Sequence, residues 1–327
     1  MTINKDSYAT LLLCSDLALR EDDVKSYTTV QWFNLAQKLL NAKLTPEALF
    51  DIDKVKNVLR LDETETERIS RLLDRAGKFG VAISNLNEKG IYTLTKSDSD
   101  YPEKLKRKLK KYAPPVLFYS GNIAIMKNKG VAIVGSRNIE EEDAMLFTQK
   151  LARCCADAGV NIVSGGARGV DSVAEQTSNN ADGTSLIFVA DSLEKKIRTK
   201  ETRHAIMRNE TLVLSAQRPD MPFKTYTAMD RNKYIYAMAD FVVAVSSDYN
   251  KGGTWSGAVE NLKNGWTPLF VRDEEGVPKG NLHLIKDYNA FPITAEAFDC
   301  QDIFQWFDSA SKKIEKSTDD GEQLSLF

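Results

Sequence analysis

From Gly130 onward, short apolar runs alternate with longer segments whose apolar residues recur at helical spacing. Runs of three to five residues rich in valine, isoleucine and leucine are typical of buried strands. They predict strands at 131–134, 160–163, 185–189, 212–214, 241–245 and 269–271. The segments between them predict helices at about 140–158, 169–179, 199–209, 226–238 and 254–264. Strands separated by such helices form right-handed βαβ units with a mainly parallel sheet. We therefore predict an α/β, doubly wound, Rossmann-like domain that binds ligands at the carboxyl ends of its strands.

The first 95 residues follow a different pattern, in which short segments of helical spacing are joined by polar loops. They predict helices around 8–19, 30–40, 46–50 and 69–79. We expect a small helical domain of the SAM-like or helix-hairpin-helix kind, although a packing or dimerisation module fits the pattern equally well. The expected division is a helical domain at 1–95, the Rossmann-like domain at 96–292, a helical segment at 293–315 and a disordered tail at 316–327.

The segment that joins the two predicted domains is strongly basic. Residues 103–111 contain six lysines and arginines, but Leu105, Leu109 and Tyr112 recur at helical spacing. This pattern favours a solvated amphipathic helix over a nucleic-acid contact. Pro114 and Pro115 then end the helix, and the apolar run 116–119 predicts a strand that leads toward the core.

Composition and charge narrow the classes of function. The formal net charge of -2 gives no overall nucleic-acid signature, so any such site must be a local patch. No apolar run reaches membrane-spanning length and the first residues do not form a signal peptide, so we expect a cytoplasmic protein without membrane contact. The four cysteines have no C-x-x-C spacing and there are only two histidines. We therefore expect neither a metal site nor a cofactor.

Two glycine-rich turns follow the first two predicted strands. Gly135, Ser136 and Arg137 end the first strand, and residues 164–171, with the sequence SGGARGVD, end the second. Glycines let backbone amides approach a phosphate, helix N-termini add partial positive charge, and Arg137 and Arg168 can add bidentate contacts. Neither turn is GxGxxG, and each alone could be only a tight connection. Together they predict a phosphate-binding edge.

Three further turns fall on the same predicted edge. Residues 190–198, 223–233 and 251–258 place cations, hydroxyls and glycines near helix starts, and Phe223, Tyr226 or Trp255 could either stack on a base or pack in the core. The full set of candidate DNA- or phosphate-binding residues is Gly135, Ser136, Arg137, Ser164, Gly165, Gly166, Arg168, Gly169, Asp171, Lys195, Lys196, Lys224, Arg231, Asn232, Lys233, Gly252, Gly253 and Thr254.

Seven blocks of sequence occur in the order and spacing of one known family. They are YPEKL, APPVLFYSGN, VAIVGSR, IVSGGARGVD, DSLEKKI, DRNKYI and KGGTWSGA. Over about residues 100–275 the chain resembles the DNA-processing protein A family, DprA or Smf. The resemblance implies a Rossmann-like fold after a helical domain, binding of single-stranded DNA in a basic pocket, a homodimer, and loading of the recombinase RecA onto that DNA, without catalysis.

The resemblance can be carried over turn by turn. The GSR turn is Gly135, Ser136 and Arg137, the SGxAxGxD turn supplies Ser164, Gly165, Gly169 and Asp171, the RN pair is Arg231 and Asn232, and Gly253 and Ala258 match a fourth turn. The chain also departs from the family. Glu175 stands where the family usually has histidine, Lys233 replaces an arginine, and only one or two helices are predicted after Pro292, where a winged-helix domain is usual. We therefore expect a divergent member.

Two other functions fit parts of the pattern. Phosphoribohydrolases related to lysine decarboxylases share the fold and the phosphate turns, and they cleave nucleotides with an arginine and a glutamate. Glu175 or Glu260 could supply that carboxylate here, although the spacing differs from their GGxGTxxE turn. A regulatory protein, such as an antitoxin or a phage-defence sensor of DNA or nucleotides, is also compatible with the missing winged-helix domain.

The last five residues form a short motif of their own. Residues 309–322 contain almost no apolar side chains and predict disorder, yet Gln323, Leu324, Ser325, Leu326 and Phe327 follow them. Large apolar anchors on a flexible tether are what a short linear ligand needs. The QLSLF sequence is similar to the peptide by which bacterial proteins bind the DNA polymerase sliding clamp. A frayed terminus, or one that packs back on the protein, is the alternative.

Overall fold

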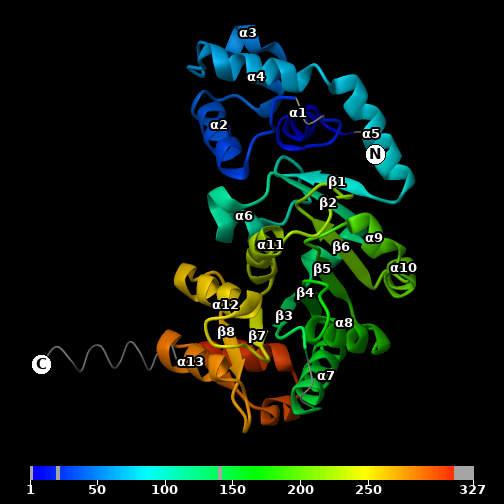
Figure 1. The fold of residues 1–327 in the computed structure, drawn as a ribbon, viewed down its shortest axis with the longest axis vertical. Coiled ribbons are helices and arrows are strands. Elements are labelled where there is room, and N and C mark those ends of the chain that lie inside the picture. Colours follow the sequence, from blue (N-terminus) through cyan, green and yellow to red (C-terminus); the bar gives the residue numbers. More distant parts are fainter. Residues whose placement is uncertain (1–2, 20–22, 139–141, 313–327) are drawn as a thin grey trace, which may run out of the picture.

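The computed structural model describes residues 3–19, 23–138 and 142–312 of the 327-residue chain. Its centre is a sheet with the strand order β1-β2-β6-β5-β4-β3-β7-β8-β9 (Figure 1). The strands are β1 (Tyr92–Thr95), β2 (Val116–Gly121), β3 (Gly130–Val134), β4 (Asn161–Ser164), β5 (Ser185–Phe188), β6 (Thr211–Ser215), β7 (Phe241–Ala244), β8 (Leu269–Arg272) and β9 (Phe291–Ile293).

The strands from β3 to β9 pair in parallel, so the predicted mainly parallel, Rossmann-like sheet is confirmed. The predicted strand at 116–119 is β2, which pairs antiparallel with β6. Two strands were not predicted. β1 contains two threonines and pairs with β2 at the sheet edge, and β9 has three residues including a proline. Neither has an apolar run, so only tertiary pairing reveals them as strands.

Helices cover both faces of the sheet. One face, with Ala132 and Val134, packs against α6 (Glu103–Leu109), α11 (Thr225–Met238), α12 (Gly252–Asn264) and α13 (Lys279–Tyr288). The other face, with Val131 and Ile133, packs against α7 (Glu142–Asp157), α8 (Val170–Asn180) and the helical residues 303–312. Successive strand residues point to opposite faces, which explains why these strands are apolar throughout.

The order in which the chain adds parallel strands reverses between β3 and β7, since β4 and β5 lie on one side of β3 and β7 and β8 on the other. The chain leaves β3 toward α7 on one face, whereas α11, which precedes β7, and α12, which follows it, lie on the other face (Figure 1). Crossovers to opposite faces leave a crevice at the carboxyl ends of two such neighbouring strands, and this crevice is where ligands bind in open α/β sheets. The predicted helix at 199–209 is preceded by a separate helix, because Thr199 separates α9 (Leu193–Arg198) from α10 (Lys200–Met207).

The N-terminal helices pack above the edge of the sheet formed by β1 and β2 (Figure 1). They are α1 (Lys5–Cys14), α2 (Thr29–Asn41), η1 (Pro46–Asp51), α3 (Ile52–Val55), α4 (Glu63–Leu73) and α5 (Ala76–Glu88). Trp32, Leu35 and Leu49 contribute to a core within this unit, whereas Leu12 and Phe79 belong to a cluster that includes residues of the sheet. The small helical unit predicted before the Rossmann-like domain is therefore present.

The predicted last helix of this unit is divided at Arg75. This buried side chain donates hydrogen bonds to the carbonyl oxygens of Leu12, Ser15 and Leu17, and so occupies carbonyls at the end of α1. The sequence pattern at 69–79 is apolar on both sides of Arg75, and it could not show that the arginine is needed at a distant helix end.

At the other end of the sheet, η4 (Ala295–Asp299) and the helical residues 303–312 follow β9, as predicted after Pro292. Phe307 packs against Phe241 and Phe270, with ring centroids 5.3 and 4.8 Å apart. No helix among the described residues combines the length and the apolar character that a membrane crossing requires. The QLSLF motif lies outside the described residues.

Candidate nucleic-acid interface

The two glycine turns after β3 and β4 lie against each other. The amide of Val170 donates to the carbonyl oxygen of Ser136 at 3.2 Å. Gly169 has a φ of 79°, and a Cβ atom there would lie 2.2 Å from the same oxygen. A Cβ atom on Gly135 would lie 2.3 Å from the side chain of Val170. Because any larger residue would separate the turns, these glycines are required by the approach of one backbone to the other.

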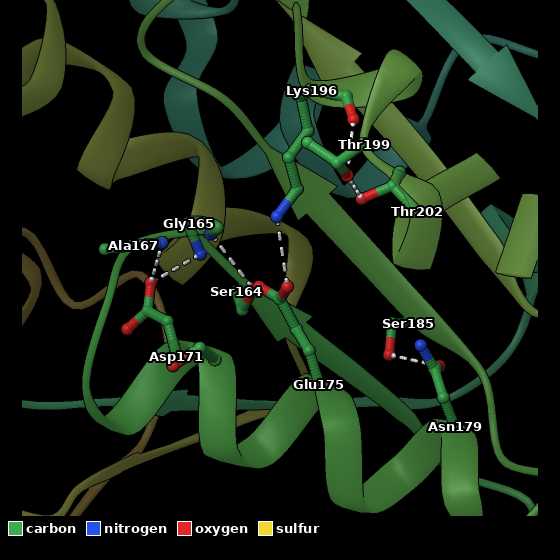
Figure 2. Close-up of polar contacts among 12 residues, drawn as sticks. Ser164, Gly165, Ala167, Asp171, Glu175, Asn179, Ser185, Lys196, Thr199 and Thr202 are labelled. Carbon is green, nitrogen blue, oxygen red and sulfur yellow. Dashed lines mark hydrogen bonds and ion pairs between the residues drawn. The ribbon is translucent and has the colours of Figure 1, made fainter. Parts of the chain in front are cut away.

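Asp171 organises the second turn (Figure 2). Its carboxylate accepts hydrogen bonds from the amides of Gly165 at 2.9 Å and Ala167 at 3.3 Å. Burial raises the pKa of Asp171, while the nearby Arg231 guanidinium and these two amides act in the opposite direction. Two backbone amides of the predicted phosphate turn are therefore already bound to a carboxylate of the protein. Asp171 holds the shape of the turn.

Glu175, which stands where the resembling family has histidine, lies beneath this turn (Figure 2). The hydroxyl of Ser164 donates to its Oε1, and the Nζ of Lys196 lies 3.4 Å from its Oε2. Burial raises the pKa of Glu175, and the positive charge of Lys196 opposes that shift. The hydroxyl of Ser164 also accepts from the amide of Gly166 at 3.2 Å. Lys196 thus joins α9 to the end of β4 through a buried carboxylate.

A cavity of about 640 Å³ lies at the carboxyl ends of β3 and β7. Half of the eighteen candidate residues line it, namely Gly135, Ser136, Arg137, Asp171, Arg231, Asn232, Gly252, Gly253 and Thr254. The lining also includes Phe223, which was predicted as a possible stacking residue, and Lys251, which begins the predicted turn 251–258, as well as Met229, Ser246 and Asp248, which the sequence analysis did not single out. Ser246 directly follows the predicted strand 241–245, so its place at the carboxyl edge of the sheet could have been predicted from the sequence. Lys251 is a cation directly before the Gly252-Gly253 pair.

Hydrogen bonds connect the start of α12 to its neighbours around the cavity. The hydroxyl of Thr254 donates to the carbonyl oxygen of Gly135 at 3.0 Å. The side-chain amide of Asn232 donates to the carbonyl oxygen of Gly253 at 3.1 Å. Both side chains therefore hold backbone turns in position, and α11, α12 and the end of β3 form one connected wall.

Arg231 is a buried cation in the wall of this cavity, with 8% of its surface exposed. Its guanidinium lies on Gly165, where a Cβ atom would be only 1.4 Å from Nη1. The side chain forms no hydrogen bond or ion pair with the described residues, and its Nε is buried without a partner there. Burial lowers the pKa of Arg231, and the charge of Asp171 opposes the shift. A buried guanidinium without a bound acceptor is costly, so its environment is suited to an anionic ligand.

The other candidates lie outside the cavity lining. Ser164, Gly165, Gly166 and Gly169 belong to the turn that supports it, Lys196 is paired with Glu175, and Arg168, Lys195 and Lys224 are exposed outside it. Lys233 forms an ion pair with Asp230 on α11. The sequence places all of these residues near one sheet edge, but burial and pairing separate them into supporting and lining groups.

The three aromatic side chains that could stack on a base lie in different environments. Trp255 is buried and packs edge to face against Tyr249 and Tyr288, with ring centroids 5.1 and 5.9 Å apart. Phe223 and Tyr226 are 50% and 64% exposed, and the Arg137 guanidinium lies 5.6 Å from the centroid of the Phe223 ring. Trp255 therefore belongs to the core, and Phe223 is available at the cavity.

The two glutamates that were considered as catalytic groups for nucleotide cleavage are placed differently from the cavity-lining candidates. Neither Glu175 nor Glu260 lines the cavity. The carboxylate of Glu175 is occupied by Ser164 and Lys196. Among residues 3–19, 23–138 and 142–312, no group of three or more histidine, cysteine and acidic side chains could hold a metal ion.

Comparison with known proteins places this fold and its turns in one family. Residues 92–304 match the family described as DNA recombination-mediator protein A. Over 180 residues, 54% of the chain, the sequence is 28% identical to the DNA processing protein DprA of Streptococcus pneumoniae. Over 144 residues, 42% of the chain, it is 28% identical to the protein Smf of Escherichia coli. The matched regions cover 62% of the pneumococcal protein and 37% of the Escherichia coli protein.

Solved structures agree. The X-ray structure of DprA from Streptococcus pneumoniae superposes with a TM-score of 0.61 at 20% identity, covering 84% of this chain and 97% of that one. DNA processing protein A from Helicobacter pylori, whose structure addresses its binding of single-stranded DNA, superposes with a TM-score of 0.53 at 25% identity, covering 68% of this chain and 96% of that one. The resemblance inferred from the seven sequence blocks is thus confirmed, and the chain belongs to the DNA recombination-mediator protein A family.

Proposed function

We propose that this protein binds single-stranded DNA in the cavity between β3 and β7 and acts as a recombination mediator. The observation that carries the proposal is Arg231, a buried cation without an acceptor among the described residues, in the wall of a cavity formed by glycine-rich turns. Arg137 and Lys251 add two more cations to the lining. Family membership supports the same function.

The cavity favours an unpaired strand over a duplex. A volume of about 640 Å³ is suited to individual nucleotide units, whereas a duplex has its bases stacked inside and offers mainly its backbone. Phe223 and Met229 line the cavity and are each 50% exposed, so an unpaired base could pack against them. Stacking on aromatic side chains tolerates any base, and we therefore expect little sequence preference.

The lining and supporting residues would have different roles. Arg231, Arg137 and Lys251 would contact phosphates, while Asp171 and Thr254 would hold the turns in place. We further propose that the protein forms a homodimer and that its protein partner is RecA, both of which follow from the family and from no contact described above.

A salt-dependent titration with single-stranded DNA, duplex DNA and mononucleotides tests this function. We expect single strands to bind most tightly, and a strand short enough to contact only the cavity should show a slope of log K against log salt near -2, because three phosphate contacts contribute about 0.7 each. Chromatography of the mononucleotide samples serves as the control for enzymatic activity. Equal binding of duplex and single strands would contradict the proposal, and release of free base would favour the phosphoribohydrolase-like alternative.

We also propose that the QLSLF motif binds the bacterial sliding clamp. A peptide of residues 315–327 should bind a purified clamp, and Phe327→Ala should lose most of that binding because a large apolar anchor is removed. Surface plasmon resonance with both peptides measures the difference. Equal signals for the two peptides would remove the clamp from the proposed function and leave DNA binding unaffected.

A further inference from the structure

The basic segment before β2 contains more cationic side chains than are needed for its contacts with the rest of the protein. Residues 103–112 contain six cations and one acid. Two of the cations anchor α6 to the start of β7. The Nζ of Lys104 lies 2.7 Å from a carboxylate oxygen of Asp240, and Lys108 donates to the carbonyl oxygen of Ala239 at 2.7 Å and to the hydroxyl of Thr267 at 2.6 Å. These contacts explain part of the basic character as structural.

Three cations of the segment have no such role. Arg107, Lys110 and Lys111 are exposed, and their side chains form no hydrogen bond or ion pair with the described residues. The Nζ of Lys106 lies 3.9 Å from the Oε2 of Glu103, which is the acidic residue of the segment. Like charges within five positions repel one another, so an anion that binds beside them would be stabilised.

An exposed aromatic ring lies between one of these cations, Lys111, and a cation of α11, Lys233. Tyr112 is 45% exposed, and its ring centroid is 5.1 Å from the Nζ of Lys111 and 5.7 Å from the Nζ of Lys233. An aromatic face next to several cations is the combination by which proteins hold single-stranded nucleic acid, since bases stack on the ring while phosphates meet the charges.

The exposed face of α11 connects this ring to the cavity. Met229 lines the cavity, and Lys233 is four residues further along the same helix. Residues four apart lie on the same helix face, about 5–6 Å from each other. The route from the cavity therefore runs over Met229 and Lys233 to Tyr112. Asp230 is the acid on this route, and its ion pair with Lys233 would have to open for a phosphate to bind there.

We propose that Arg107, Lys110, Lys111, Tyr112 and Lys233 form a second contact surface for single-stranded DNA, which holds the part of the strand that leaves the cavity. We call it the α6 surface. The proposal rests on the proposed function of the cavity. It replaces the expectation that the charges of residues 103–111 are only a solvated helix face, because Lys111, one of the three exposed cations, adjoins the exposed Tyr112 ring and that ring adjoins Lys233 on the route to the cavity.

The test compares a short and a long strand on a variant that keeps the anchors. In the triple variant Arg107→Gln, Lys110→Gln and Lys111→Gln, Lys104 and Lys108 are unchanged. Oligothymidines of about 3 and about 16 nucleotides are titrated by fluorescence anisotropy or competition. We expect the long strand to lose roughly tenfold or more in affinity at low salt, and its salt slope to fall by about 2, while the short strand binds within about twofold of wild type.

A matched control removes the same charge elsewhere. Lys78, Lys150 and Lys200 are exposed lysines on α5, α7 and α10, and their triple glutamine variant should bind the long strand nearly as well as wild type. Tyr112→Ala should weaken the long strand about fivefold or more, whereas Tyr112→Phe should retain it, because the ring and not the hydroxyl stacks.

Three outcomes would overturn the α6 surface: wild-type affinity and salt slope of the first triple variant for the long strand, an equal loss for short and long strands, or an equal loss in the two triple variants. Failure of the cavity itself would look different, since wild type would then not bind the short strand. Thermal unfolding of each variant shows whether a loss comes from misfolding. If a triple variant is unstable, the comparison of Tyr112→Ala with Tyr112→Phe tests the same surface through one side chain.

Discussion

Arg231→Met is expected to reduce the affinity for single-stranded DNA at least a hundredfold while leaving the protein folded. The buried guanidinium has no acceptor among the described residues, so a charge-assisted contact with a phosphate, of about 3 kcal/mol, would be lost. Methionine keeps much of the apolar volume and removes the cost of burying a charge, which offsets the loss of attraction to Asp171. We expect the free energy of unfolding to change by no more than about 1–2 kcal/mol.

Anisotropy titration and chemical denaturation measure the two effects together. Arg168→Met is the matched control, because Arg168 is an exposed arginine on the neighbouring turn and does not line the cavity. It should lose only a few fold in affinity. Wild-type affinity of the Arg231→Met protein would show that the cavity is not the DNA site, and a large loss of stability would show that Arg231 is mainly structural.

Gly169→Ala is expected to be the most destabilising of the single glycine substitutions in the turns. Its φ of 79° and ψ of -130° form a conformation that is essentially restricted to glycine. The added Cβ atom would lie 2.2 Å from the carbonyl oxygen of Ser136 and 2.7 Å from backbone atoms of Arg137. Since backbone cannot rotate away as a flexible side chain can, we expect a loss of about 3 kcal/mol or more in the free energy of unfolding.

Chemical denaturation again measures this loss, and Gly80→Ala is its control. Gly80 lies within α5, where a Cβ atom would meet only the Tyr8 hydroxyl at 3.9 Å. This substitution should raise the free energy of unfolding by up to about 1 kcal/mol, because alanine favours the helix. Similar stabilities of the Gly169→Ala and Gly80→Ala proteins would mean that the two turns after β3 and β4 do not need their close approach.

The local sequence pattern was sufficient to predict the elements whose residues occur mainly in one kind of structure. The runs at 131–134 and 241–245 are apolar throughout because both faces of the sheet are covered, and such runs identify buried parallel strands from sequence. β1 was missed because an edge strand needs no apolar run. α9 was not predicted, because residues 190–198 were interpreted as a cationic turn and the helical pattern was placed only at 199–209.

The candidate site was predictable as a place but not as a set of contacts. The glycine turns after β3 and β4 identify the sheet edge, since parallel strands deliver their carboxyl ends to one side. The sequence could not predict which of the charged side chains at this edge form ion pairs with one another. Lys196 is bound to Glu175 and Lys233 to Asp230, whereas Arg231 is left without a partner among the described residues. All three looked equivalent as cations near one edge.

The sequence by itself determined the parallel α/β fold, the sheet edge that carries the glycine turns, and the family to which the chain belongs. Each of these depends on apolar periodicity or on blocks of neighbouring residues, which are local along the chain. Only the tertiary structure decided which cations remain available, that Asp171 uses two turn amides, and that Tyr112 adjoins Lys233 on α11. The reason is physical. Whether a charged side chain is available to a ligand depends on its burial and on the ion-pair partner that folding brings to it. Neither is determined by its neighbours in sequence.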